Sequence, residues 1–156
     1  MRKALKFLHT LASCGMIGGL SGYAAVLLYS PQDTASRYAD MRQTIETLSN
    51  SILLPSMIVA LVTGLLSMAV HPPFQDTRGV WVKALMGLSL FEATLVVVQT
   101  KATDGADVSQ EIAAGRAAPD ALLAVLAGEW ETLFVIMALL VANVALGVWR
   151  PSLKRR

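Results

Sequence analysis

Four long apolar stretches constrain what this chain of 156 residues can fold into. They cover residues 5–29, 52–70, 80–98 and 133–149. A helix needs about 20 apolar residues to cross the hydrocarbon layer of a bilayer, and each stretch comes close to that length. Only 15% of the residues are charged, compared with roughly 25% in soluble domains. We therefore expect residues 1–156 to form a single integral membrane domain, an all-α bundle of four transmembrane helices.

The basic residues predict how this bundle is oriented. Nine of the thirteen Lys and Arg residues lie before the first stretch, around the start of the third, or after the fourth. They are Arg2, Lys3, Lys6, Arg78, Lys83, Arg150, Lys154, Arg155 and Arg156. Because positive charge collects on the cytoplasmic side of membrane proteins, we expect both termini and the loop at 72–79 to be cytoplasmic. This distribution accounts for the net charge of +2, so the bilayer, and no nucleic acid, is the expected partner.

The first stretch contains four glycines in two pairs. Gly15 and Gly19 are four residues apart, as are Gly18 and Gly22. Small residues at this spacing allow helix backbones to approach closely in lipid. We expect them to pack against another helix of the same chain rather than to form a dimer face.

Polar segments connect the apolar stretches on the outer side. Residues 35–50 carry apolar residues three or four apart, which predicts either an amphipathic helix on the membrane surface or an outward extension of the second span. Residues 100–128 are acidic and rich in alanine, and we expect a loop there with a short helix over 109–117. Trp81, Trp130 and Trp149 are expected at the membrane boundaries.

One polar residue from each helix is expected at the same depth near the cytoplasmic face. These residues are His9, His71, Lys83 and Asn143. His9 lies on a helix face that continues through Ser13, Met16, Leu20 and Tyr23, and we expect this face to point inward. Two interpretations of the layer stay open, a binding site and ordinary polar residues that reach the interface.

Glu92 is expected near the middle of the membrane. Ser89 and Gln99 share its helix face at spacings of three and seven residues, whereas Lys83 lies on roughly the opposite face. A direct pair between Glu92 and Lys83 is therefore not expected. Ionisable residues inside membranes usually have a function, and two roles stay open for Glu92: a hydrogen bond to another helix, or transfer of protons.

His9 has the chemistry of a haem ligand. A neutral imidazole in a dry helical bundle is a good axial ligand for haem iron, and small residues on neighbouring helices leave room for a flat macrocycle. Basic side chains at the cytoplasmic rim are suited to hold the propionates. The alternative is a buried histidine that is hydrogen-bonded within the protein. One Cys and two His do not favour a zinc or copper centre.

Two motifs carry a family resemblance. Lys6-Phe7-Leu8-His9-Thr10-Leu11-Ala12 is followed by Gly18-Gly19-Leu20, and the third stretch opens with Gly79-Val80-Trp81-Val82-Lys83-Ala84. These motifs resemble a group of small bacterial four-helix membrane proteins. It includes an uncharacterised family of predicted integral membrane proteins, whose relatives are haem-containing membrane protoporphyrinogen oxidases and copper-resistance D proteins. The resemblance implies a multi-pass protein of the bacterial inner membrane, with His9 as ligand of a haem b iron and Lys83 as an essential basic residue.

The resulting expectation is a b-type haem protein in membrane redox chemistry, either porphyrinogen oxidation or quinone-linked electron transfer. Lys83 would orient an anionic group of a quinone or porphyrin-like partner, Glu92 would carry protons, and His71 and Asn143 would complete the cofactor site. The alternative is a non-catalytic subunit of a membrane complex, a homo-oligomer or a small transporter element. In that case the polar residues would contact partner helices, so enzymatic activity stays open.

Overall fold

The computed structural model describes residues 2–70 and 78–149, except for the side chains of residues 2, 78–80, 83 and 146–149. The described residues form helices and connecting turns, without strands. The helices are α1 (Arg2–Tyr29), α2 (Ala35–Leu48), η1 (Ser49–Leu53), α3 (Leu54–Ala69), α5 (Arg78–Ala93), η2 (Thr94–Gln99), α6 (Thr100–Ala113), α7 (Asp120–Leu126) and α8 (Glu129–Trp149).

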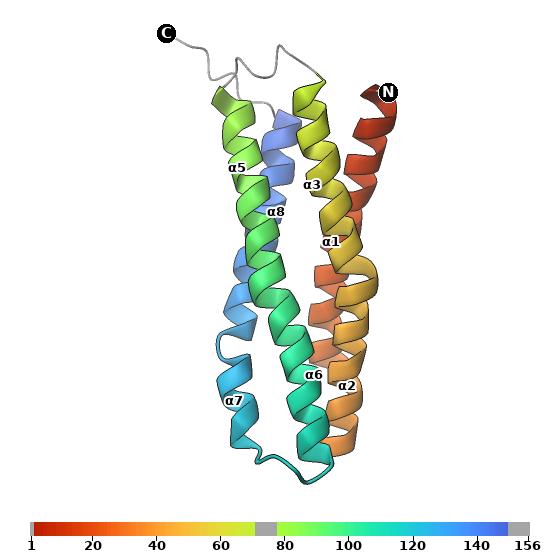
Figure 1. Cartoon of the computed structure of the whole chain (residues 1–156), viewed down its shortest axis with the longest axis vertical. Coiled ribbons are helices and arrows are strands. Elements are labelled where there is room, and N and C mark those ends of the chain that lie inside the picture. The colour runs from red at the N-terminus through yellow and green to blue at the C-terminus, as the bar shows by residue number, and fades with distance from the viewer. Residues whose placement is uncertain (1, 71–77, 150–156) are drawn as a thin grey trace.

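Four of the helical segments are long and apolar enough to cross a membrane. Figure 1 shows the start of α1, the end of α3, the start of α5 and the end of α8 at one end of the bundle. Lys3 and Lys6 lie at this end, which is the one that the positive charges predict to be cytoplasmic, and we call it the cytoplasmic end. The structure thus confirms the all-α four-helix transmembrane bundle.

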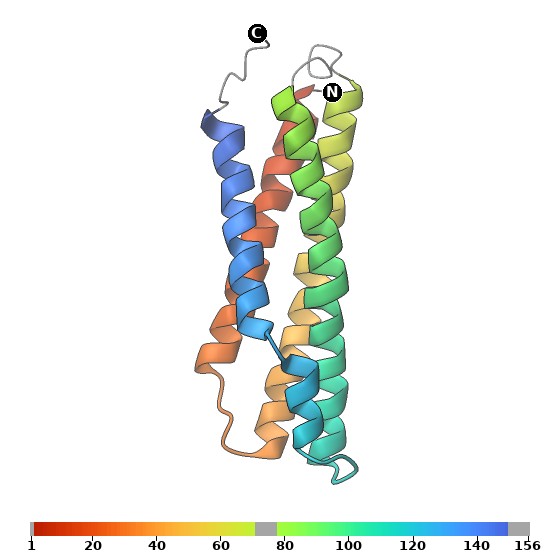
Figure 2. The same ribbon diagram turned by 90° about the vertical axis from the view of Figure 1, so that its left-hand side faces the viewer.

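Two of these helices are much longer than their apolar stretches. α2, η1 and α3 form one continuous helix over Ala35–Ala69, and α5, η2 and α6 form another over Arg78–Ala113. Thirty-five helical residues span about 50 Å, whereas the hydrocarbon layer is about 30 Å thick. In Figure 2, α2 and α6 reach past the end of α1 and the start of α8, so the excess length is expected to continue beyond the outer face of the membrane. The extension of the second span is thereby confirmed.

The expectation of a loop at 100–128 was wrong. Residues 100–113 form α6, and the helix ends where a separate one over 109–117 was expected. The reason is that α6 buries small side chains against α2, namely Ala102, Gly105, Ala106 and Ser109. Their spacing of three and four residues lets the two helices approach closely, although the same segment carries exposed acidic residues on its other face.

Each long helix contains a wide π-helical turn, η1 in the second span and η2 in the third. η1 has a local cause. Pro55 lacks a backbone N–H and its ring would collide with the carbonyl of Ser51 in a regular α-helix. The wider turn at Ser49–Leu53 lies directly before Leu54 and Pro55, so the helix continues through the proline.

The most extensive contact in the bundle is between α1 and α3. The glycines of α1 make it possible, because a Cβ on Gly15 would lie 3.1 Å from Ser56 Cβ, and one on Gly19 would lie 3.4 Å from Leu53 Cβ. The expected packing within the chain is thus confirmed for these two positions. Gly18, by contrast, has no atom of another element within 4 Å of the place that a Cβ would take. α5 packs on α8 and α3, so the second and third spans are neighbours as expected.

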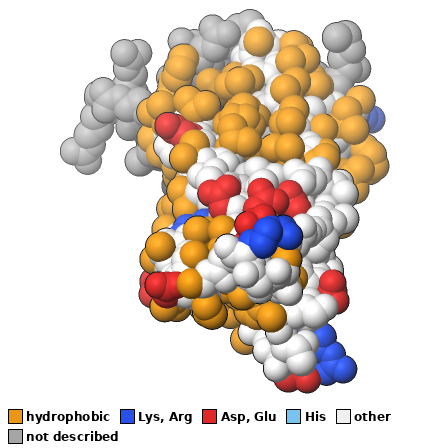
Figure 3. All heavy atoms as spheres, turned by 60° about the horizontal axis from the view of Figure 1, so that its bottom comes forward, with side chains coloured by type: hydrophobic (Ala, Val, Ile, Leu, Met, Phe, Trp, Pro, Cys, Tyr) orange, Lys and Arg blue, Asp and Glu red, His pale blue; other side chains and the backbone are white. Residues whose placement is uncertain are grey.

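The part of the molecule beyond the outer face consists of the start of α2, α6 and α7. Lys101 connects α6 to the end of α7, where its Nζ donates to the carbonyl oxygens of Val125 and Ala127. Figure 3 views this end, where acidic and basic side chains gather, while the surface above them is mostly apolar. The polar end and the apolar belt are those of a membrane protein with an outer extension.

Candidate functional site

His9 lies between α1 and α3 in the cytoplasmic half of the bundle. Its Nδ1 is 2.9 Å from the carbonyl oxygen of Ala60 and 3.2 Å from Thr63 Oγ1. A carbonyl oxygen only accepts hydrogen bonds, so Nδ1 carries the proton and donates. Nε2 is the other ring nitrogen and takes no part in these two contacts. The two contacts fix the orientation of the imidazole.

The residues around His9 explain its position. Thr63 donates its own hydroxyl proton to the carbonyl oxygen of Val59 at 2.6 Å, which leaves its oxygen able to accept from the imidazole. Gly64 makes room for the ring, because a Cβ there would lie 3.4 Å from His9 Cε1. Since α3 covers one side of the imidazole, His9 is half-buried.

Asn143 lies on α8 against α5. Its Nδ2 is 4.0 Å from the place that a Cβ on Gly87 would take, and its Oδ1 is buried without a hydrogen-bond partner among the described residues. Gln99 donates to Asn50 at 2.6 Å between the third and second spans. These two spans are antiparallel, and Gln99 and Asn50 lie at the same depth. Counting the same number of residues back from Gln99 to Gly87 and forward from Asn50 to Val62 places Gly87 at the depth of Val62, close to Gly64. His9 and Asn143 therefore share a depth, but they contact different helices.

The other two residues of the expected layer are Lys83 and His71. Lys83 belongs to α5, one turn before Gly87; its side chain lies outside the described part of the structure. His71 also lies outside the described residues. The layer of four polar side chains therefore stays a prediction for these two positions.

Glu92 is not brought to His9. Its side chain is exposed on α5, whereas His9 faces α3. Ser89 is exposed beside it, as the shared face predicts, but Gln99 turns toward Asn50. No hydrogen bond or ion pair of Glu92 occurs within residues 2–70 and 78–149.

A cluster of buried polar side chains at the outer boundary was not expected from the sequence. Arg42 of α2 forms two hydrogen bonds with Glu129 of α8, Nη1 to Oε1 at 2.7 Å and Nη2 to Oε2 at 3.0 Å. Tyr23 of α1 donates to Glu129 Oε1 at 2.6 Å. Arg42 Nη2 donates to the hydroxyl of Tyr38 at 2.8 Å, and the guanidinium lies 5.2 Å from the centre of that ring. We call these four residues the outer ion-pair cluster.

Burial distinguishes this cluster from the other ion pairs among the described residues. The side chains of Arg42 and Glu129 are 3% and 7% exposed, while the partners Arg37 and Asp33 are 59% and 60% exposed. A buried pair is costly to desolvate, and each charge depends on the other to offset that cost. The cluster joins α1, α2 and α8, and its buried charges offset each other, so we interpret it as a structural contact.

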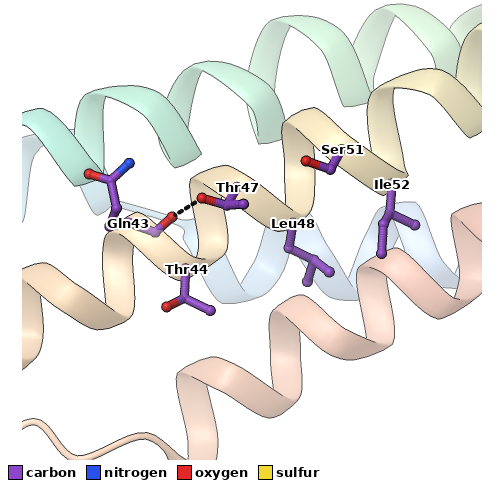
Figure 4. A pocket seen from close by; sticks show the side chains of 6 residues that line it. All are labelled: Gln43, Thr44, Thr47, Leu48, Ser51 and Ile52. Atoms are coloured by element: carbon purple, nitrogen blue, oxygen red, sulfur yellow. Dashed lines mark hydrogen bonds between the residues drawn. The ribbon is translucent and has the colours of Figure 1, made fainter.

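Two surface hollows of the described residues lie away from His9. The first, of about 350 Å³, is lined by residues of α2 and η1, and Figure 4 shows Thr44, Leu48 and Ile52 pointing toward the side of α1. It contains no titratable side chain. The second, of about 260 Å³, lies between α5 and α8 and is lined by Ser89, Leu90 and Leu139 among others.

Comparison with known protein families gives a match over most of the chain. A family model described as a predicted integral membrane protein, DUF2269, matches residues 3–151. The chain belongs to this DUF2269 family. No curated protein and no solved structure matches it. The expected uncharacterised membrane-protein family is thereby confirmed, and the match does not extend to haem-containing oxidases or copper-resistance D proteins.

In this DUF2269 protein the sequence contains one signal for the outer ion-pair cluster. Arg42 follows Tyr38 and Met41 on the apolar face of residues 35–50, where an exposed arginine would not be expected. Glu129 gives no such signal, because an acidic residue at the start of the fourth span is equally suited to the membrane interface. Nothing in the sequence indicates that two residues 87 positions apart form a pair.

Proposed function

We propose that this DUF2269 protein binds one b-type haem through His9 and takes part in membrane redox chemistry. The observation that supports the proposal most is the hydrogen bond from His9 Nδ1 to the carbonyl of Ala60. Histidines that bind metals generally donate their second ring N–H to a carbonyl or carboxylate, which fixes the ring and raises the basicity of the other nitrogen. His9 already makes a hydrogen bond of this kind.

The surroundings of His9 fit the same group. The imidazole is half-buried within an apolar bundle, an environment in which histidine serves as an axial ligand of haem iron. Lys6, exposed less than one turn before His9, is available to a propionate at the cytoplasmic rim. When bound, haem supplies a one-electron carrier. Quinone or porphyrin-like compounds are the proposed electron partners, and Lys83 would orient an anionic group of such a partner.

Glu92 has no part in this proposal. Its exposed side chain on α5 lies away from His9, so protons carried by Glu92 would not reach the imidazole directly. The residues that this proposal assigns to the site are His9, its supports Thr63 and Gly64, and the basic residues of the rim.

The test is an absorption spectrum of the full chain, purified after expression with ample haem. We expect a Soret band and a pyridine haemochrome of b type, and both should be lost in His9→Ala. His71→Ala is the matched control, because it replaces the only other histidine, and it should keep the band. Gly64→Leu, which would press on the ring, should weaken or shift it. A colourless wild-type protein, or a band that His71→Ala removes and His9→Ala does not, would contradict the proposal.

A further inference from the structure

Glu92 lies at the middle of the membrane. Gly87 of α5 faces Asn143 of α8, and the two helices are antiparallel. Counting the same number of residues forward from Gly87 to Glu92 and back from Asn143 to Ala138 places Glu92 opposite Ala138, at the centre of α8 (Glu129–Trp149). Its carboxyl group is thus exposed about halfway through the hydrocarbon layer. A polar group at this depth requires a partner.

The described part of the chain does not supply that partner. Its basic side chains are Lys3 and Lys6 at the cytoplasmic end, and Arg37, Arg42, Lys101 and Arg116 at the outer boundary or beyond it. The nearest polar side chain on the same face is Ser89, which is exposed one turn earlier on the same helix. Among the described residues, Glu92 therefore has no basic partner at its depth, and another molecule in the membrane can supply a hydrogen-bond partner.

The residues around Glu92 have the pattern of a helix-pairing face. Leu85, Ser89, Glu92 and Val96 follow one another at spacings of four, three and four residues, and all four are exposed, Leu85 by 62% and Val96 by 60%. This is the spacing of the seam residues in paired helices, where one polar residue within an apolar seam fixes register and orientation. We call these four residues the Glu92 seam.

We propose that the Glu92 seam binds the same seam of a second copy of this chain within the membrane. A second copy inserted in the same orientation carries its own Glu92 and Ser89 at matching depths. Ser89 is a hydrogen-bond donor about 4.5 Å from Glu92 along the helix axis, within reach of a glutamate side chain on the facing helix. Because the pair of chains has a two-fold axis, two equivalent hydrogen bonds form, one from each Ser89 hydroxyl to Glu92 of the other copy.

The surface beside the seam fits this arrangement. The hollow between α5 and α8 is lined by Val82, Leu85, Met86, Ser89, Leu90 and Leu139, and its walls are mainly apolar. In a symmetric contact each copy presents both the seam and the hollow, so apolar side chains of one copy can fill the hollow of the other. Packing and interhelical hydrogen bonds are two of the forces that associate helices in lipid.

Cysteine crosslinking in native membranes tests the dimer. The lone native thiol is first removed as Cys14→Ser. In this background we expect Leu85→Cys and Val96→Cys to form a disulfide-linked species of twice the chain mass. Leu11→Cys is the matched control: it is exposed to a similar extent, 57%, but lies on α1. Crosslinking to Leu11→Cys alone, or a product whose mass is that of the chain plus a different protein, would overturn the proposal.

The role of Glu92 itself is tested by substitution in the same assay. Glu92→Leu should reduce the crosslinked fraction at position 85 at least tenfold, and Ser89→Ala should reduce it less. Glu92→Gln keeps a hydrogen-bond acceptor and should retain most of it. An unchanged crosslinked fraction in Glu92→Leu would overturn the proposal. The haem spectrum is read from the same membranes, and its loss without loss of crosslinking would show that the failure belongs to the His9 site alone.

Discussion

Glu129→Gln is expected to destabilise the protein by about 3–5 kcal/mol, because it leaves the buried guanidinium of Arg42 without a counter-charge. For a chain of this size that corresponds to a fall in Tm of roughly 10 °C. Arg42→Met should have an effect of similar size, since the carboxylate of Glu129 would keep only the hydroxyl of Tyr23 as a donor. Thermal unfolding of the purified protein in detergent, followed by tryptophan fluorescence, measures both.

The double variant and an exposed pair make this prediction specific. The double variant Arg42→Met/Glu129→Gln should lose less stability than the two single variants lose together, because no uncompensated charge is then buried. Asp33→Asn breaks the pair with Arg37, which has similar distances but is mostly exposed. Exposed pairs contribute about 0–1 kcal/mol, so its Tm should hardly change. Equally small shifts in Tm for Asp33→Asn and Glu129→Gln would contradict a structural role for the outer ion-pair cluster.

Gly19→Leu is expected to separate α1 from α3. Even a Cβ at this position would lie 3.4 Å from Leu53 Cβ and 3.5 Å from its Cα, and the backbone atom cannot move aside. Overpacking of this kind costs about 1–3 kcal/mol. The measurement is the same thermal unfolding, together with the Soret band, since His9 is held by the α3 backbone that α1 would leave.

The adjacent glycine is the control for this second prediction. Gly18 is exposed and no atom of another element lies within 4 Å of the place a Cβ would take. Gly18→Leu adds the same side chain to the same helix, but toward lipid. Its Tm and spectrum should match those of the wild type. A loss of stability in Gly18→Leu equal to that in Gly19→Leu would show that the effect arises from any added side chain on α1 and not from the contact with Leu53.

The transmembrane bundle could be predicted from the sequence because it depends on the length of the apolar stretches and on the position of the basic residues. α6 was not predicted, because its acidic residues and small buried side chains do not form an apolar stretch that marks a helix of the bundle. What makes the segment helical is that Gly105 and Ala106 fit against α2, a contact between distant parts of the chain. The same limit applies to Arg42 and Glu129, whose pairing is fixed by how α2 and α8 meet.

The depth of a residue in the membrane was easier to predict than the direction in which its side chain points. The position of Glu92 along its helix follows from counting residues, and its place opposite the centre of α8 agrees with the expected depth. Its direction does not follow, because the faces of residues 80–98 are similarly apolar and offer no contrast between lipid and core. For His9 the buried stripe of Met16, Leu20 and Tyr23 gave that contrast, so its inward position was predictable, whereas the contact with Ala60 and Thr63 was not.

The turn between α6 and α7 is held well clear of the lipid. α6 has 14 residues and is about 21 Å long, so residues 114–119 stand at its far tip. Gly115 there adopts a φ of 71° and has open space around it. A short epitope inserted at this tip would report which side of the membrane it occupies while leaving both the surroundings of His9 and the Glu92 seam undisturbed.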